Sequence, residues 1–233
     1  MHSFFRNNGL TIVLMALFLI TWAGQLFSGH REHNQDQRDH GQPPIGLGEY
    51  LGGGHFWQAT AENWESEFLQ MAMFVLLTVF LYQKGSPESK DPDEDDAVDN
   101  DPALQKSNPK APAPVRQGGL ALWLYSHSLS ICFLLLFLGS FALHARKGVE
   151  EFNEERREHG DAAMSATQYM GTSQFWFESF QNWQSEFLSL AAMVYLSVYL
   201  REKGSAESKP VAAPHDESGE EEPVIRPGRP AVA

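Results

Sequence analysis

The chain has 233 residues and a formal net charge of −13, and its mean hydropathy of −0.33 is that of a soluble acidic protein. This charge argues against a nucleic-acid-binding role, because no basic stripe is present to neutralise phosphates. It also argues against a polybasic contact with anionic lipid. The single cysteine excludes a disulfide within the chain. The average hydropathy is misleading, however, because the apolar residues are gathered in blocks.

The first apolar block runs from Gly9 to Phe27 without a charged residue. About 19 residues at 1.5 Å each give roughly 28 Å, close to the thickness of a hydrocarbon core. A cleaved signal peptide is the alternative, because Thr21-Trp22-Ala23 weakly resembles a cleavage site. The matching apolar segment 129–143 is internal, where a signal peptide has no role. We therefore favour an uncleaved membrane helix.

Two polar segments follow apolar blocks, at 29–41 and 148–160. Segment 29–41 has no proline and ends at Gly41, which is typical of the residue that stops a helix. Segment 148–160 repeats this pattern with more helix-favouring residues and ends at Gly160. We expect each segment to continue the preceding membrane helix for about three turns. The glycine-rich segment 45–55 is expected to be a loop.

An aromatic stripe begins at Phe56. Trp57, Ala61, Trp64 and Phe68 follow at steps of four, three and four, which is the period of a helix. Tryptophan is enriched where helices cross the headgroup layer. The stripe therefore predicts a second membrane helix, although the core-facing side of a soluble helix would show the same period.

The apolar runs of the second and fourth expected helices are short. Residues 68–82 and 187–200 give about 15 and 14 residues, against the roughly 20 that a spanning helix needs. Either these runs are re-entrant or the spans recruit the residues before them. Lys84-Gly85 and Lys203-Gly204 are expected to end the helices, with a cation in the last turn and glycine as the stop.

The organisation of the chain follows from these blocks. We expect an all-α integral membrane fold in which four transmembrane helices form two hairpins that pack as a bundle. The first hairpin is residues 1–90 and the second is residues 119–209, with Gly119 to His144 as the third span. The acidic, proline-rich linker 91–118 and the acidic tail 210–233 are expected to be disordered, because their composition cannot bury a core.

The two hairpins are copies of each other. Residues 4–90 and 123–209 align at a fixed offset of 119 positions, with 33 identities in 87 positions. Because each copy has two spans, both copies insert in the same orientation. Eleven Lys and Arg lie in the N-terminus, linker and tail, against six in the two loops. The positive-inside rule then predicts cytoplasmic termini and external loops.

Three short motifs occur in both copies. They are N-W-x-S-E-F-L at 63–69 and 182–188, K-G-S-x-E-S-K at 84–90 and 203–209, and R-[DE]-H-G at 38–41 and 157–160. With these motifs, residues 4–209 resemble a bacterial family of small integral membrane proteins known only as a domain of unknown function. The resemblance implies an integral bacterial membrane protein, which we expect in the plasma (inner) membrane, and it supplies no activity and no catalytic residue.

The first of these motifs supplies the candidate functional or helix-packing residues. They are Asn63, Trp64, Ser66, Glu67, Asn182, Trp183, Ser185 and Glu186. Glu67 and Glu186 are ionisable groups close to the apolar boundary, where such groups are often functional. The structural interpretation, a hydrated carboxylate at the helix entrance, is favoured. The asparagines and serines are suited to hydrogen bonds between helices.

We expect no metal site and no cofactor. His30 and His33 share a helix face, but Val149 and Phe152 replace them in the second copy. A histidine beside a glycine stop, as at His40, is explained by the helix dipole. No nucleotide-binding or hydrolase motif is present, so we expect no enzyme. The favoured function is a structural or protein-interaction role in the cell envelope. The alternative is a proton or cation conductor that uses Glu67 and Glu186.

Overall fold

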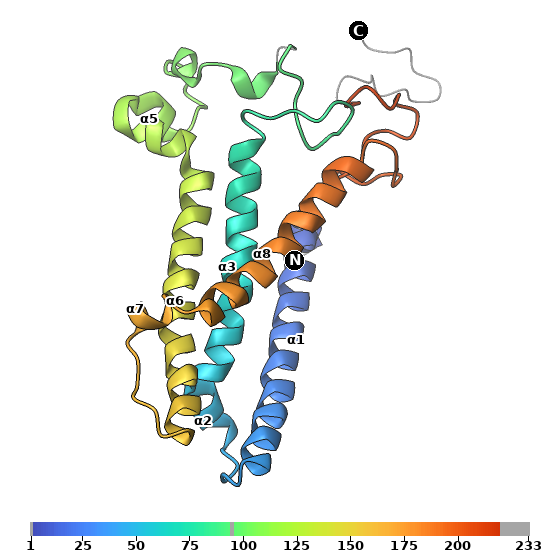
Figure 1. Ribbon diagram of the computed structural model, residues 1–233. Helices are drawn as coiled ribbons and strands as arrows, with labels where there is room; N and C mark the ends of the chain where they lie inside the picture. The colour runs from blue at the N-terminus through green and yellow to red at the C-terminus, as the bar shows by residue number, and fades with distance from the viewer. Residues whose placement is uncertain (1, 94–95, 220–233) are drawn as a thin grey trace. The chain divides into compact units, whose positions relative to one another are not determined.

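The computed structural model describes residues 2–93 and 96–219 of the chain (Figure 1). The described residues form eight α-helices and two short 3₁₀ helices and contain no β-strand, which confirms the all-α prediction. The elements are α1 (His2–Asp39), α2 (Leu47–Gly52), α3 (Gly54–Leu77), η1 (Ala97–Asp99), η2 (Pro102–Gln105), α4 (Ala113–Gln117), α5 (Gly119–Ser126), α6 (Ser128–Glu158), α7 (Ala166–Tyr169) and α8 (Ser173–Leu196).

The chain divides into two compact units. Unit 1 comprises Met1–Trp64 and Ser140–Glu178, and unit 2 comprises Glu65–Gly139 and Ser179–Ala233. Each unit therefore takes residues from both sequence copies, and α3, α6 and α8 contribute to both units. The hairpin boundaries at 1–90 and 119–209 remain a prediction about the sequence repeat.

Two of the four expected spans are long and apolar enough to cross a membrane. They lie in α1 and α6, and the most apolar stretch of α1 has no buried residue. Helices α3 and α8 fall short because they end at Leu77 and Leu196, before the predicted stops at Lys84 and Lys203. Each has only about 10 apolar helical residues, roughly 15 Å. Beyond these helices, backbone hydrogen bonds of the tighter 3₁₀ type appear, which join residues three positions apart. One of them runs from Val79 N to the Leu76 carbonyl.

The third expected span is also interrupted. Residues 119–144 do not form one helix, because His127 has φ −111° and separates α5 from α6. The equivalent residue of the first copy, Asn8, has φ −127° inside α1. The break is therefore a feature of both copies, and the apolar helix of the second copy begins at Ser128.

The predicted helical extensions are confirmed. Helix α1 continues to Asp39 and α6 continues to Glu158. Each is followed by a glycine in the left-handed region, Gly41 at φ +74° and Gly160 at φ +75°. Gly160 therefore suffices as a stop although no proline follows it.

Unit 1 holds the loops of both copies by the same contacts. Asn34 accepts a hydrogen bond from Ile45 N at 2.7 Å and donates one to the Ile45 carbonyl at 3.0 Å. Asn153 makes the same two bonds with Met164, at 2.7 and 2.9 Å. Each asparagine thus satisfies two backbone groups of the loop after its helix.

A tyrosine follows each of these loops and packs on a glycine of the long helix. Tyr50 lies against Gly29, and Tyr169 lies against Gly148. A Cβ atom at Gly29 would meet the Tyr50 hydroxyl at 2.3 Å, and one at Gly148 would meet the Tyr169 ring at 2.6 Å. Only glycine admits so close an approach, so each long helix carries a socket for the tyrosine of its copy. Tyr169 also belongs to the buried apolar cluster with Ala145, Val149 and Phe175.

The described part of the linker contains three short helical turns. Two of them are capped by aspartates, since Asp96 accepts from Val98 N and Asp101 accepts from Ala103 N. The disorder predicted for 91–118 remains a prediction, and residues 94–95 lie outside the described part. Lys209, the last residue before the tail, is buried and donates to the carbonyls of Gly85, Pro214, His215 and Glu217. The rest of the predicted tail, 220–233, lies outside the described residues.

Candidate functional site

Among the candidate residues of the first N-W-x-S-E-F-L motif, Trp64 packs against a second helix. Trp64 lies against Phe18 and Trp22 of α1, with ring centroids 6.2 Å apart in both pairs. Ser66 is buried, and Asn63 donates to the Ala59 carbonyl within its own helix at 2.7 Å. The motif therefore fixes one face of α3 against α1 through its tryptophan.

The second motif does not reproduce these surroundings. Ser185 is exposed and donates to the carbonyl of the half-buried Asn182 at 2.8 Å. The ring centroids of Trp183 and Phe137 of α6 are 6.2 Å apart, and Trp183 donates its indole N–H to Glu65. The two tryptophans therefore have different partners although their motifs are nearly identical.

The two glutamates that the sequence singles out differ in exposure. Glu67 is exposed, whereas Glu186 is half-buried. The charge of Glu67 acts on Glu186, so the structure brings the two carboxylates into electrostatic contact. The two side chains therefore differ in exposure although the repeat gives them equivalent positions.

The buried carboxylate of the motif is Glu65, which the sequence did not single out. Its side chain is fully buried and accepts a hydrogen bond from Trp183 Nε1 at 2.9 Å. One turn before it lies the buried Ala61 and two turns after it the buried Ala72. These small residues at helical spacing were the signal for an interior face at position 65.

A second interior polar contact lies one turn further along α3. Gln70 is buried and donates to the Glu186 carbonyl and to Ser189 Oγ, each at 3.0 Å. Together with the Glu65–Trp183 bond, this contact joins α3 to α8 within unit 2 through satisfied hydrogen bonds.

Unit 1 contains a buried histidine between two carboxylates. His144 is fully buried, with its Nε2 atom 3.3 Å from Glu178 and 3.9 Å from Glu62. Glu178 also accepts hydrogen bonds from Tyr169 and, at 2.9 Å, from Gln174. Burial alone would raise the pKa of Glu178, but the bonds from His144, Tyr169 and Gln174 outweigh it and hold the pKa below its usual value of 4.5. The pKa of the buried Tyr169 hydroxyl is raised, by burial and by the bond to Glu178.

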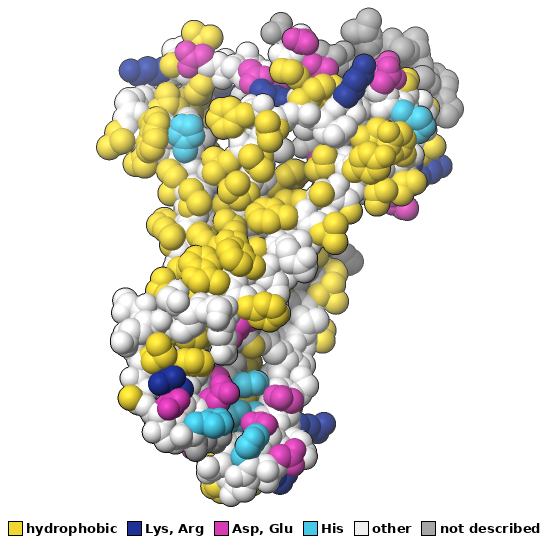
Figure 2. All heavy atoms as spheres, in the orientation of Figure 1, with side chains coloured by type: hydrophobic (Ala, Val, Ile, Leu, Met, Phe, Trp, Pro, Cys, Tyr) yellow, Lys and Arg dark blue, Asp and Glu magenta, His cyan; other side chains and the backbone are white. Residues whose placement is uncertain are grey.

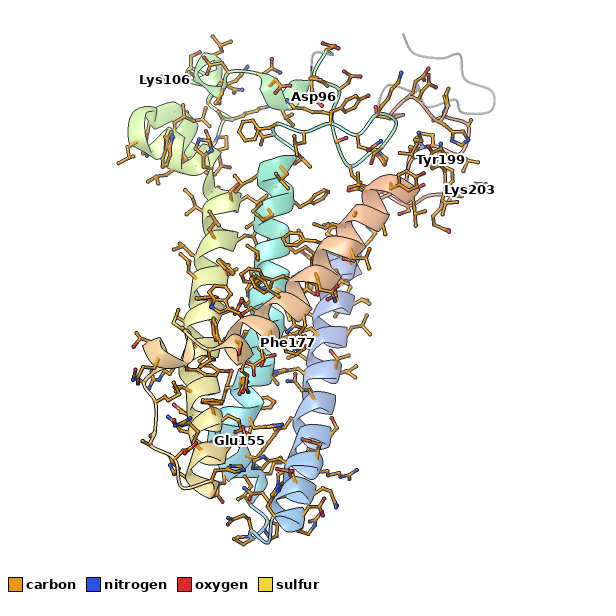
Figure 3. The ribbon with its side chains drawn as sticks, viewed as in Figure 1. Asp96, Lys106, Glu155, Phe177, Tyr199 and Lys203 are labelled. Carbon is orange, nitrogen blue, oxygen red and sulfur yellow. The ribbon has the colours of Figure 1, made fainter. Side chains whose placement is uncertain are left out.

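A different cluster lies in a cleft of unit 1. His33 of α1, His55 of α3 and Glu151 of α6 offer ligand atoms that all lie within 4.8 Å of one another. His33 and Glu151 line this cleft of about 290 Å³ together with Asp36, Glu154 and Glu155, and His55 lies behind them, within reach of both. Figure 2 shows histidine side chains gathered with Asp and Glu side chains in this region of unit 1, and Figure 3 shows Glu155 on the last turns of α6.

The environment of this cluster disfavours charge on two of its groups. Glu151 lies about two turns beyond the end of the apolar stretch of α6. Burial raises its pKa to about 7, with added repulsion from Glu154, Asp36 and Glu32 and an opposing hydrogen bond from the His55 backbone. Burial and the neighbouring His33 lower the pKa of His55, against the pull of Glu32 and Asp36. Of these three residues, the sequence suggested only His33 as a metal ligand, together with His30, because His55 and Glu151 lie on other helices.

The family of the chain follows from its match to a family model over residues 1–220, described as "Domain of unknown function (DUF6766)". The chain belongs to the DUF6766 family. This confirms the resemblance to a family of unknown function. No curated protein and no solved structure matches the chain. For this member of the DUF6766 family, function must therefore be argued from its own residues.

Proposed function

We propose that the protein is a non-enzymatic integral membrane protein that acts as a structural or protein-interaction component of the cell envelope. The observation that carries the proposal is the exposure of large apolar side chains along α1. Leu10, Leu14, Leu17 and Ile20 are each more than half exposed. Such a continuous apolar surface on one helix suits contact with lipid and is costly in water.

Contacts at the helix ends support a proposal for the number of crossings. His33 beyond the apolar stretch of α1 lies beside Glu151 beyond that of α6. We therefore propose that both helices leave the membrane on one side and that the chain crosses back between them through α3. Likewise, Gly85 after α3 accepts a hydrogen bond from Lys209 after α8, at 2.6 Å. This supports a multi-pass protein in which α3 and α8 cross as partners of the two apolar helices.

The orientation comes from the Lys and Arg distribution. Termini and linker carry the larger share of these cations, which supports a cytoplasmic location for them in a bacterial inner membrane. The acidic linker and tail would then offer contact surfaces to cytoplasmic proteins. The histidine-rich cleft would face the opposite side.

The interior hydrogen bonds favour the structural role over conduction. Glu65, Ser66 and Gln70 are buried polar side chains of α3 in unit 2, and Glu65 and Gln70 form hydrogen bonds with α8. Polar contacts of this kind hold helices together in membranes. A conductor remains the second candidate, because the Glu67 charge acts on Glu186 in the same unit.

Two measurements on the purified full chain test the proposal. After expression in bacteria, the protein should stay in the membrane pellet on washing with alkaline carbonate. In liposomes, the wild type should pass protons and potassium no faster than the variant Glu67→Gln/Glu186→Gln. Release by carbonate would contradict the membrane proposal. A flux that the double variant abolishes would replace the structural role with conduction.

A further inference from the structure

The cleft of unit 1 brings together side chains with the chemistry of a metal site. His33, His55 and Glu151 come from three helices, and one ligand atom of each lies within 4.8 Å of the others. Two imidazoles and one carboxylate form a ligand set that proteins use for zinc. Three atoms at these separations are close enough to surround one ion after small side-chain shifts.

The Glu151 carboxylate lacks part of its hydrogen bonding. One interaction comes from the His55 backbone, whereas its Oε2 atom is buried and has no hydrogen-bond partner among the described residues. A buried carboxylate oxygen without a partner costs free energy unless a cation or a donor satisfies it. The unsatisfied atom belongs to the group that stands beside both imidazoles, so an ion at this place would remove the cost.

Both histidines are held by neighbours outside the ligand set. His55 Nδ1 lies 2.9 Å from the Tyr50 hydroxyl, and His33 Nε2 lies 3.4 Å from the Gln37 amide. Metal-binding histidines usually use one ring nitrogen for the ion and the other for a fixing hydrogen bond. Tyr50 is itself held in the Gly29 socket, so the orientation of His55 is set by the packing of α1.

We propose that His33, His55 and Glu151 bind one divalent transition-metal ion of the zinc class. Glu32, whose carboxylate lies 3.5 Å from His55 Nε2, is placed to supply a fourth ligand or to hold a bound water. In the part of the chain that the structure describes, the residues that line the cleft include Asp36, Glu154 and Glu155 and no Lys or Arg. Their field raises the local concentration of cations at the entrance.

The site occurs once, although the sequence repeats. The residues equivalent to His33 and His55 in the second copy are Phe152 and Gln174, and the residue equivalent to Glu151 is Glu32. The two histidines therefore come from the first copy and meet a carboxylate of the second. The buried His144 is a different case, because Glu178 beside it already accepts bonds from Tyr169 and Gln174.

Zinc binding by the full-length protein in detergent micelles, with any purification tag removed, tests the proposal. Competition with a chromophoric chelator measures affinity and stoichiometry, and Co²⁺ absorption reports the ligands. The wild type should bind one Zn²⁺ per chain. His55→Gln and Glu151→Gln should each weaken binding by about 100-fold or more, because each removes a ligand. The matched control His159→Gln, an exposed histidine of the same cleft, should change affinity less than about threefold.

Circular dichroism and size-exclusion chromatography would show whether each variant keeps the wild-type fold. If one of the two ligand variants unfolds, the proposal is tested by the other ligand variant and by the Co²⁺ spectrum of the wild type. A spectrum typical of tetrahedral nitrogen and oxygen ligands supports the site. Equal affinity in the wild type and a folded Glu151→Gln variant would overturn the proposal. So would loss of binding in His159→Gln, since the ion would then sit on surface histidines.

Discussion

The indole N–H of Trp183 reaches the carboxylate of Glu65 across 2.9 Å, although 118 residues separate them in the chain. The bond joins the N-W-x-S-E-F-L motifs of the two copies, because Glu65 belongs to the first and Trp183 to the second. The repeat thus uses one motif as donor and the other as acceptor. This difference between the copies lets a donor on α8 meet an acceptor on α3 in an interior contact.

Replacing Trp183 by phenylalanine should destabilise the protein by about 1.5–3 kcal/mol, the range for hydrogen bonds to charged groups. The change keeps an aromatic ring and removes one donor to a buried carboxylate. Thermal unfolding in detergent micelles measures the effect. Trp123→Phe is the matched control, since that side chain is more than half exposed and should tolerate the change. Equal unfolding midpoints for both variants would show that the bond adds nothing.

The tyrosine sockets give a second prediction. Gly29→Ala should destabilise the protein by about 1–3 kcal/mol, because the new methyl group overlaps the Tyr50 hydroxyl. Gly24→Ala in the same helix has open space and should be neutral or stabilising by up to about 1 kcal/mol. The difference between the two unfolding midpoints is the measurement.

The two sockets differ in whether a second substitution, of tyrosine by phenylalanine, can restore the stability lost on replacing the glycine by alanine. Adding Tyr50→Phe to Gly29→Ala should restore part of the stability, because the next atom of the ring is then 3.4 Å away. Adding Tyr169→Phe to Gly148→Ala should not, because a ring carbon of Tyr169 already lies at 2.6 Å. Repair in both pairs, or in neither, would show that the close approaches do not control stability.

The pH dependence of stability should reveal Glu178. Its folded pKa lies below its usual value of 4.5, so the ionised carboxylate stabilises the fold above that pH. This contribution should be lost as pH falls from about 4.5 through the lower folded pKa. The unfolding midpoint of the wild type should therefore fall more steeply below pH 4.5 than that of Glu178→Gln. If the unfolding midpoints of the two proteins change in parallel with pH, Glu178 does not contribute to the pH dependence of stability.

Topology gives a further prediction. Reporter fusions after Gln42 should report the outside and fusions after Asp101 the cytoplasm, if α1 and α3 cross in opposite directions as proposed. The cation asymmetry between linker and loops motivates the orientation. If both fusions report the same side, α3 does not return through the membrane. The opposite pattern at both positions would reverse the orientation and keep the crossings.

Local signals in the sequence predicted the helix stops well. Gly41 and Gly160 end their helices as expected, because a residue at positive φ is encoded by the glycine itself. The sequence predicted the ends of α3 and α8 several residues after Leu77 and Leu196, where the helices end. An apolar run does not indicate at which residue the α-helical hydrogen bonding stops. The break at His127 was missed for the same reason.

The candidate sites depend on contacts between the copies, which the sequence does not display. Glu67 and Glu65 are two residues apart in one motif, and only packing makes Glu65 the buried one. His33 became a candidate ligand because α3 and α6 place His55 and Glu151 beside it. The repeat itself argued against a metal, since Phe152 stands at the matching position.

The native Cys132 allows the most direct test of the central claim, that the apolar stretch of α6 lies in lipid. It is the chain's single cysteine, and its side chain is exposed on that stretch. In native membranes a charged maleimide should leave Cys132 unmodified until sodium dodecyl sulfate is added. A cysteine placed at the exposed His159 in a Cys132→Ala background should react once the reagent reaches that side. Modification of Cys132 at the rate of this control would contradict a membrane location for α6.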